Sequence, residues 1–270
     1  MPVLPIEVPR VTTDPAPFGL LDTFAPQAMD GKGTFAGVTY ESEFCGIARP
    51  WVRPCVDPGP GVEKEPDDGI PFVTGEPIPI YHLHTCRLVG SGGESDQIAR
   101  ARRSLELGAS RAVEQGFGTV LNGDPNLDDL TTGTAVGVIE ALALLEQAGG
   151  VAYGGRRVIH ADNALVTFLI SQSLVVERNG HLETMLGSIV VSGPGYANAD
   201  TTANPPAADS RWMYATGAVN VWAGAGTYTP VTLNIGAGGS YDNEYKTLAE
   251  RIYVPTYECF VAGAETLLEA

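Results

Sequence analysis

The sequence predicts an α+β fold whose long helix and long two-stranded ribbon have to be covered by other surfaces. Helical and strand patterns are intermixed along the chain without a repeated βαβ unit, which favours α+β over a doubly wound parallel sheet. An amphipathic helix is expected near residues 94–117, and strand-type segments flank an acidic stretch between residues 38 and 89. With 270 residues the chain is long enough for a sizeable core.

The composition excludes several classes of protein. Lys and Arg number 16 against 32 Asp and Glu, and the resulting net charge of −16 argues against wrapping nucleic acid, which requires cations. No uncharged apolar run is long enough to cross a membrane, and the Pro-rich start MPVLPIEVPR lacks the apolar stretch of a signal peptide. The cysteines are too few and too scattered for a disulfide scaffold, so reduced thiols are expected at Cys45, Cys55, Cys86 and Cys259.

The first third of the chain is expected to hold little core of its own. Residues 1–37 are rich in proline without periodicity and predict an extended arm. Residues 37–55 and 70–89 are strand-like, and the acidic, Pro- and Gly-rich residues 56–69 between them predict a solvated tip near 57–69. A ribbon of two strands is marginal in water, so it has to lie on another surface of this chain or of a neighbour.

Three helices are expected. The first, over 94–117, follows a capping-box pattern of Ser91 and Glu94 and places Glu106 and Glu114 with the arginines on its wet side. The second, over 134–148, is apolar nearly all round and is expected between two layers. The third runs from about 162 to 171.

Strands are expected around these helices. Residues 156–161 predict one strand, and residues 175–186 predict a hairpin because they contain Asn179–Gly180. Further strands are expected over 188–193 and 212–224, and a final strand pair over 245–268.

The sequence contains few patterns typical of catalytic or metal-binding sites. His82, His84 and Cys86 alternate on one strand face with zinc-type ligands, which leaves a small metal enzyme open as an alternative that elemental analysis tests. His160 is expected as a core histidine with satisfied ring nitrogens, and His181 as a solvated turn residue. GSGGES at 90–95 lacks the lysine of a phosphate loop, and no nucleophile elbow occurs. We therefore expect no catalytic residues, no cofactor and no metal.

A set of short motifs points to a family. Asn179–Gly180 is followed by Leu186–Gly187, the apolar strand Ile189–Val191 and Pro194, and Tyr214–Gly217 forms a Tyr-Ala-Thr-Gly strand. In this order, after an arm, a two-stranded loop and a long helix, they resemble the major capsid proteins of tailed bacteriophages. These proteins have the Hong Kong 97-type fold, which encapsulin nanocompartments share.

The resemblance implies a division of the chain. It places an N-terminal arm at 1–37, an E-loop at 38–89, a spine helix with peripheral domain at 90–130, an axial domain at 131–235 and a return to the peripheral domain at 236–270. It implies a structural protein, not an enzyme, that self-assembles as pentamers and hexamers into an icosahedral shell around double-stranded DNA. Contacts with the DNA would not be sequence-specific. An encapsulin-type compartment is the first alternative.

The same resemblance implies partners and a location. Some relatives carry a long segment that is cleaved off, and because this chain begins at Met1 we expect a separate scaffolding protein instead. A portal during assembly, a possible decoration protein and no membrane are also expected. The protein would be assembled in the host bacterial cytoplasm and end in the virion capsid.

The acidic tip needs cations wherever it packs on a neighbour. The densest cationic group is the set of arginines on the long helix, although these can instead pair with Glu106 and Glu114 of their own helix. The candidates for subunit contacts are Trp51, Arg53, Glu63, Lys64, Glu65, Asp67, Asp68, Arg100, Arg102, Arg103 and Arg111.

The residues present allow two kinds of covalent link, of which the first is suggested by the resemblance. Lysine–asparagine cross-links, known in part of the family, could use only Lys32, Lys64 or Lys246. If the ribbon closes near its acidic tip, Cys45 comes opposite Cys86, although a disulfide there is not favoured under reducing conditions.

Overall fold

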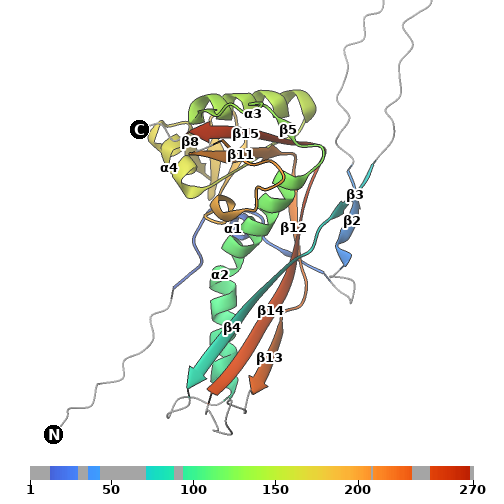
Figure 1. Cartoon of the computed structure of the whole chain (residues 1–270), viewed down its shortest axis with the longest axis vertical. Coiled ribbons are helices and arrows are strands. Elements are labelled where there is room, and N and C mark those ends of the chain that lie inside the picture. Colours follow the sequence, from blue (N-terminus) through green and yellow to red (C-terminus); the bar gives the residue numbers. More distant parts are fainter. Residues whose placement is uncertain are drawn as a thin grey trace, which may run out of the picture.

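The computed structural model describes residues 13–29, 36–42, 71–87, 94–207, 209–232 and 244–267. Figure 1 shows a compact block at one end, in which helices lie against a sheet, and an elongated part in which a long helix lies beside a second sheet. A short two-stranded ribbon stands at the side of the elongated part. The predicted α+β class is confirmed.

The long helix α2 (Glu94–Gly123) runs the length of the elongated part. It continues past the predicted end at residue 117 because Leu121 extends the same buried stripe. That stripe packs on the second sheet and consists of Ala101, Leu105, Ala109, Val113, Phe117 and Leu121. At Gly116 an added Cβ would lie 2.7 Å from the side chain of Ile78, so the helix approaches the sheet closely there.

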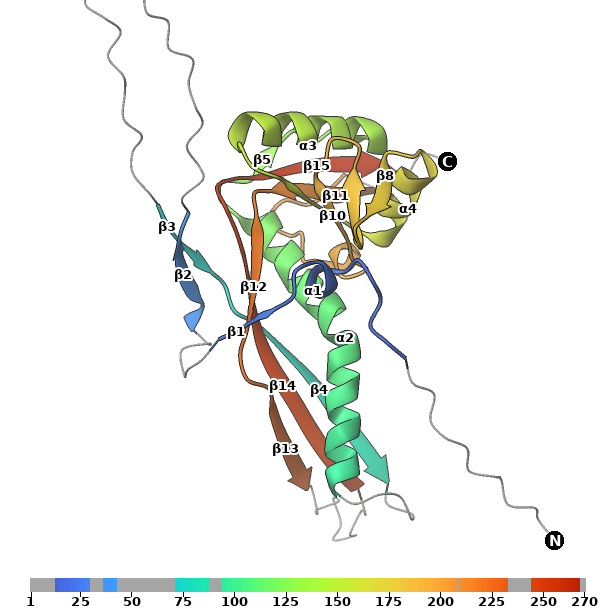
Figure 2. The same cartoon turned by 180° about the vertical axis from the view of Figure 1, so that it is seen from behind.

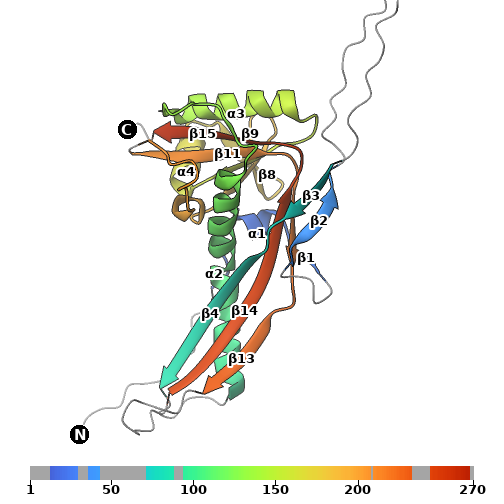
Figure 3. The same cartoon turned by 45° about the vertical axis from the view of Figure 1, so that its right-hand side comes forward.

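The second sheet has five strands and is organised around the 14-residue strand β14 (Glu244–Tyr257). The strands β13 (Thr227–Thr232) and β12 (Val219–Ala223) lie along one edge of β14, and β4 (Ile78–Arg87) lies along the other. The short strand β1 (Gln27–Ala28) pairs with β12. Figure 3 shows β4, β14 and β13 side by side in front of the lower part of α2.

The ribbon is formed by β2 (Val38–Glu41) and β3 (Phe72–Gly75). The predicted ribbon also included residues 78–87, but these form β4 and pair with β14 over ten positions, from Arg87 opposite Glu244 to Ile78 opposite Tyr253. The register that would bring Cys45 opposite Cys86 would pair Val38 with Gly93, whereas Val38 pairs with Gly75. The predicted register is therefore wrong; Cys45 itself lies outside the described residues.

The compact block contains an eight-stranded mixed sheet. Its order is β5 (Asp128–Asp129), β15 (Val261–Leu267), β11 (Ser210–Thr216), β7 (Val158–Ala161), β10 (Ile189–Ser192), β9 (His181–Thr184) and β8 (Val175–Arg178), and β6 (Val136–Gly137) also pairs with β15. The predicted hairpin is confirmed: β8 and β9 are joined by Asn179 and Gly180, whose φ angles of 52° and 81° fit a type I′ turn.

Among the described elements, the chain passes between the sheets through α2, from β4 to β5, and at two direct strand-to-strand crossings. The single strand predicted over 212–224 is interrupted near Gly217, so that β11 lies in the eight-stranded sheet and β12 in the five-stranded sheet. The chain crosses back between β14 and β15. The crossings touch, because a Cβ on Gly217 would lie 2.3 Å from the carbonyl oxygen of Glu258.

The outer face of the compact block is covered by α3 (Val138–Ala152) and α4 (Asn163–Ser171). Asp162 caps α4 by accepting hydrogen bonds from the backbone N–H groups of Ala164 and Leu165. The expectation that the second helix lies between two layers is wrong, because Ile139 and Val151 of α3 are exposed. Figure 2 shows α1 (Leu20–Thr23) against α2 on the opposite side of the molecule from β4.

Two further observations concern the described helices and one cysteine. None of the helices that the structure describes is long and apolar enough to span a membrane. Cys259, in the turn between β14 and β15, is disulfide-bonded, so the expectation of reduced thiols is wrong for this residue.

Candidate subunit-contact surfaces

The four arginines predicted to receive the acidic tip lie on α2 and divide into two pairs. Arg100 forms an ion pair with Asp96 and Arg102 one with Glu106, each at 2.8 Å and one helical turn apart. Arg103 and Arg111 are exposed, and neither has an ion pair within the part of the chain that the structure describes. The other predicted candidates, Trp51 to Asp68, lie outside the described residues.

Glu114 was expected on the wet side of α2 as a partner for the arginines, and this is wrong. The side chain is fully buried. Its carboxylate accepts hydrogen bonds from the backbone N–H of Leu20 at 3.0 Å, from the Ser110 hydroxyl at 2.7 Å and from the backbone N–H of Gly195 at 3.2 Å. Glu114 therefore joins α1, α2 and the loop after β10, and three donors compensate its lost hydration.

The loop after β10 could have signalled this arrangement, because it contains two glycines around Pro194. A Cβ on Gly193 would lie 2.3 Å from the Glu114 carboxyl carbon, and a Cβ on Gly195 would lie 2.2 Å from the backbone oxygen of Arg111. Only glycine allows the loop to approach α2 this closely. The contact fixes the compact block on the upper half of the long helix.

His160 is a core histidine with both ring nitrogens satisfied, as predicted. Its Nδ1 lies 3.0 Å from the Tyr196 hydroxyl and its Nε2 lies 3.0 Å from the Thr216 hydroxyl. Because the Thr216 hydroxyl donates to the carbonyl of Gly217, it accepts from His160, which assigns the proton to Nε2. Burial lowers the pKa of His160 to about 3, so the ring is neutral near pH 7.

The other histidines do not form a metal site with their described neighbours. The rings of His82 and His84 are 6.5 Å apart on β4. Within the described ranges, no group of three or more His, Cys, Asp or Glu residues is arranged to hold a metal ion. His181 begins β9 and is half-buried, with its Nδ1 shielded from water, so it is less solvated than expected.

The ribbon is anchored to the body at its root. The hydroxyl of Tyr40 on β2 donates to the carbonyl of Tyr257 at the end of β14 and accepts from the backbone N–H of Tyr257 at 3.2 Å. The Tyr257 hydroxyl in turn donates to Asp124, just after α2. Burial raises the pKa of Tyr40 to about 12, so this phenol keeps its proton at neutral pH. The direction in which the ribbon leaves the body is thus fixed by hydrogen bonds.

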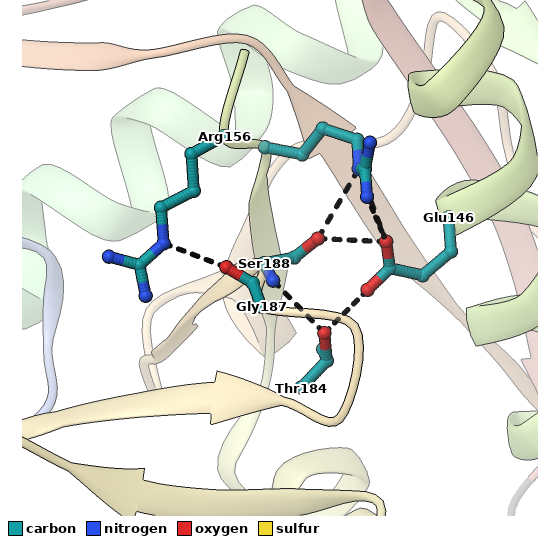
Figure 4. Close-up of polar contacts among 6 residues, drawn as sticks. Glu146, Arg156, Thr184, Gly187 and Ser188 are labelled. Carbon is teal, nitrogen blue, oxygen red and sulfur yellow. Dashed lines mark hydrogen bonds and ion pairs between the residues drawn. The ribbon is translucent and has the colours of Figure 1, made fainter. Parts of the chain in front are cut away.

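A second buried polar group, which the sequence did not signal, supports the turn between β9 and β10. Figure 4 shows that Glu146 of α3 points into this turn. Its carboxylate accepts from the hydroxyls of Thr184 at 2.6 Å and Ser188 at 2.8 Å and pairs with Arg157 at 2.9 Å. Arg156 donates to the carbonyl of Gly187 at 2.7 Å. The turn is therefore held at both ends.

Comparison with known proteins gives a clear result at the level of structure. No protein-family model and no curated protein matches the sequence. The capsid subunit of cyanophage Pam1 superposes with a TM-score of 0.52 at 10% identity, over 98% of this chain and 97% of that chain. The capsid of a native GTA particle gives a TM-score of 0.52 at 10% identity, over 98% and 95%. This chain has the Hong Kong 97-type capsid fold.

The capsid fold is shared over nearly the whole of both chains. The capsid protein of Ralstonia phage GP4 gives a TM-score of 0.50 at 12% identity, over 99% of this chain and 96% of that chain. The likeness therefore concerns the complete architecture and not a single motif. The resemblance inferred from the order of segments is confirmed as a fold.

Proposed function

We propose that the chain is a major capsid protein that assembles as pentamers and hexamers into the icosahedral head of a tailed double-stranded DNA phage. The observation that carries this proposal is the capsid fold, which extends over at least 98% of this chain in three structures that are all capsids. The protein would assemble in the cytoplasm of the bacterial host and reside in the virion capsid.

Within this proposal, each helix, sheet and ribbon of the structure corresponds to a part of a capsid subunit. The helix α2 is the spine helix, and the five-stranded sheet beside it, which includes β14 of the C-terminal segment, belongs to the peripheral domain. The compact block with α3 and α4 is the axial domain. It differs from the division at 131–235, because β12 and β13 lie in the five-stranded sheet and β15 of the C-terminal segment lies in the compact block. The ribbon β2–β3 is the root of the E-loop, and β4 is reassigned from the E-loop to the peripheral sheet because it pairs with β14.

The exposed ribbon supports assembly with copies of the same chain. Two strands alone are marginal in water, and Phe72 of β3 is 70% exposed although the root of the ribbon is firmly anchored. A neighbouring subunit would bury this side chain. The anchor at Tyr40 and Tyr257 would then define the angle at which the E-loop reaches that neighbour.

We further propose that the acidic tip at 57–69 contacts the arginines of α2 in an adjacent subunit. Arg103 and Arg111 are the strongest candidates among the described arginines of that helix, because Arg100 and Arg102 already have ion pairs within it. Trp51 and Arg53 would lie just below the contact, and Glu63, Lys64, Glu65, Asp67 and Asp68 would form it.

The arginine contact is tested by reversing one charge at a time. Arg103→Glu and Arg111→Glu should leave the subunit folded, because exposed charges contribute little to stability, but should slow shell formation and make it more sensitive to salt. Arg178→Glu, on an exposed strand of the compact block, is the matched control with the same charge change. Normal assembly of both α2 variants at 0.5 M salt or below would remove the contact.

Other partners follow from the proposed role. A separate scaffolding protein and a portal would act during assembly, and a decoration protein could bind the finished shell. The net charge of −16 favours enclosing DNA without sequence-specific contacts, because an acidic wall repels phosphates.

The proposed function is tested by the size of the assembled species. Sedimentation velocity of the purified chain, expressed with and without its scaffolding protein, should show rings of five or six subunits and closed shells. A chain that stays monomeric at high concentration in both preparations would overturn the proposal. Shells that contain a protein cargo and no route for DNA packaging would favour the encapsulin alternative.

A further inference from the structure

The turn between β9 and β10 forms the rim of an apolar groove on the compact block. The groove has a volume of about 290 Å³ and lies between α3 and this turn. Its apolar lining consists of Ile139, Leu142, Ala143, Leu174, Met185 and Leu186. Met185 is 57% exposed and Leu186 is 74% exposed, so the rim presents large apolar side chains to water.

The rim is rigid even though it is exposed. Thr184 and Ser188, which flank the turn, are both buried and both donate to Glu146. Arg156 holds the carbonyl of Gly187 from the other side, as Figure 4 shows. An apolar turn held in one conformation loses little conformational entropy when a partner covers it. The buried network therefore prepares Met185 and Leu186 for a contact.

The groove carries no net charge, which favours a second copy of this acidic chain as its partner. The whole chain carries a net charge of −16, so copies of it repel one another over most of their surface. Of the described side chains that line the groove, the only ionisable one is Glu146, and its carboxylate is paired with Arg157 at 2.9 Å. The groove is thus a neutral apolar area on a strongly acidic protein, where two copies can approach without placing like charges opposite each other.

We propose that the groove between α3 and the turn at Met185–Leu186 binds a second copy of this chain. The inference rests on the proposed function, which requires contacts between copies, and adds where one of them lies. In a ring the neighbours are related by rotation, so the groove of one subunit meets a different surface of the corresponding block in the next. A scaffolding or decoration protein in the groove is the competing outcome of the test.

The first experiment uses the unaltered protein. Methionine oxidation by dilute peroxide is followed by mass spectrometry in free subunits and in shells that contain no other protein chain. Met185 should be oxidised at least tenfold more slowly in the shells, while Met213, which is fully buried, serves as the protected reference in both samples. Equal rates at Met185 in shells and subunits, or protection only when another protein is present, would overturn the inference.

The second experiment changes the rim. Leu186→Asp should reduce the yield of shells at least tenfold, whereas Leu186→Met should assemble normally. Ala164→Asp is the control, because it adds the same charge at an exposed site on α4 outside the groove, and it should also assemble normally. Circular dichroism and sedimentation of the unassembled variants check that each is folded. Normal assembly of Leu186→Asp would contradict the inference while leaving the proposed function intact. Wild-type protein that forms no oligomer would overturn the proposed function and the inference together.

Discussion

Replacing Glu114 tests whether the contact between α1, α2 and the loop after β10 is as important as its geometry indicates. Glu114→Ala leaves the backbone N–H groups of Leu20 and Gly195 buried without their acceptor. Each orphaned donor costs about 1–3 kcal/mol, so we expect a loss of about 4 kcal/mol in the free energy of unfolding. Glu114→Gln keeps an oxygen near Leu20 and Ser110 but turns an amide NH₂ toward the N–H of Gly195, for a loss of about 2 kcal/mol.

The assay is equilibrium unfolding of the unassembled subunit in urea, followed by tryptophan fluorescence. Glu106→Gln is the matched control on the same helix, because the Glu106–Arg102 pair is exposed to solvent and should contribute little to the free energy of unfolding. A loss below about 1 kcal/mol for Glu114→Ala, or equal effects of Glu114→Gln and Glu106→Gln, would contradict this role of Glu114.

Three further predictions concern buried groups. The pKa of His160 is about 3 in the folded protein and about 6.5 in the unfolded chain. The contribution of the neutral ring to the free energy of unfolding is therefore fully present above pH 6.5 and falls as the pH drops, by roughly 2 kcal/mol at pH 5. His160→Gln should flatten this part of the plot of urea midpoint against pH. Gly195→Ala should cost more than about 2 kcal/mol because its Cβ would meet the backbone of α2, whereas Gly108→Ala, where space is open, should be neutral or stabilising in the same unfolding assay. Arg157→Met should cost about 3 kcal/mol by leaving the Glu146 carboxylate without its cation, and thermal unfolding that matches wild type would contradict this.

The sequence predicted those helices and turns that depend on residues close together in the chain. The period of apolar residues located α2, and Asn179–Gly180 located the β8–β9 turn because two positive φ angles favour these residues. The pairing of β4 could not be predicted in this way. Strand-type composition is the same whether a segment pairs with β2 or with β14, and only the tertiary arrangement places Ile78–Arg87 beside β14.

The candidate contact surfaces were only partly accessible from the sequence. Spacing by four residues predicted the Arg102–Glu106 pair. Hydropathy placed the Glu114 carboxylate in water. Its burial could not be predicted, because two of its three hydrogen-bond donors are backbone groups far away in the sequence. The sequence shows that α3 is apolar nearly all round, but the place between two layers that this predicts is wrong. One face of α3 packs on the sheet, while Ile139 lines an exposed groove that nothing in the described chain covers.

Electron cryomicroscopy of the purified assembly is the most direct test of the proposal that this chain builds a closed shell. We predict icosahedral particles made of pentamers and hexamers, into whose density the subunit fits with α2 along the shell wall and the β2–β3 ribbon reaching over a neighbour. Particles of another symmetry type, such as open fibres, or a sample that contains only isolated monomers when the scaffolding protein is co-expressed, would contradict the claim.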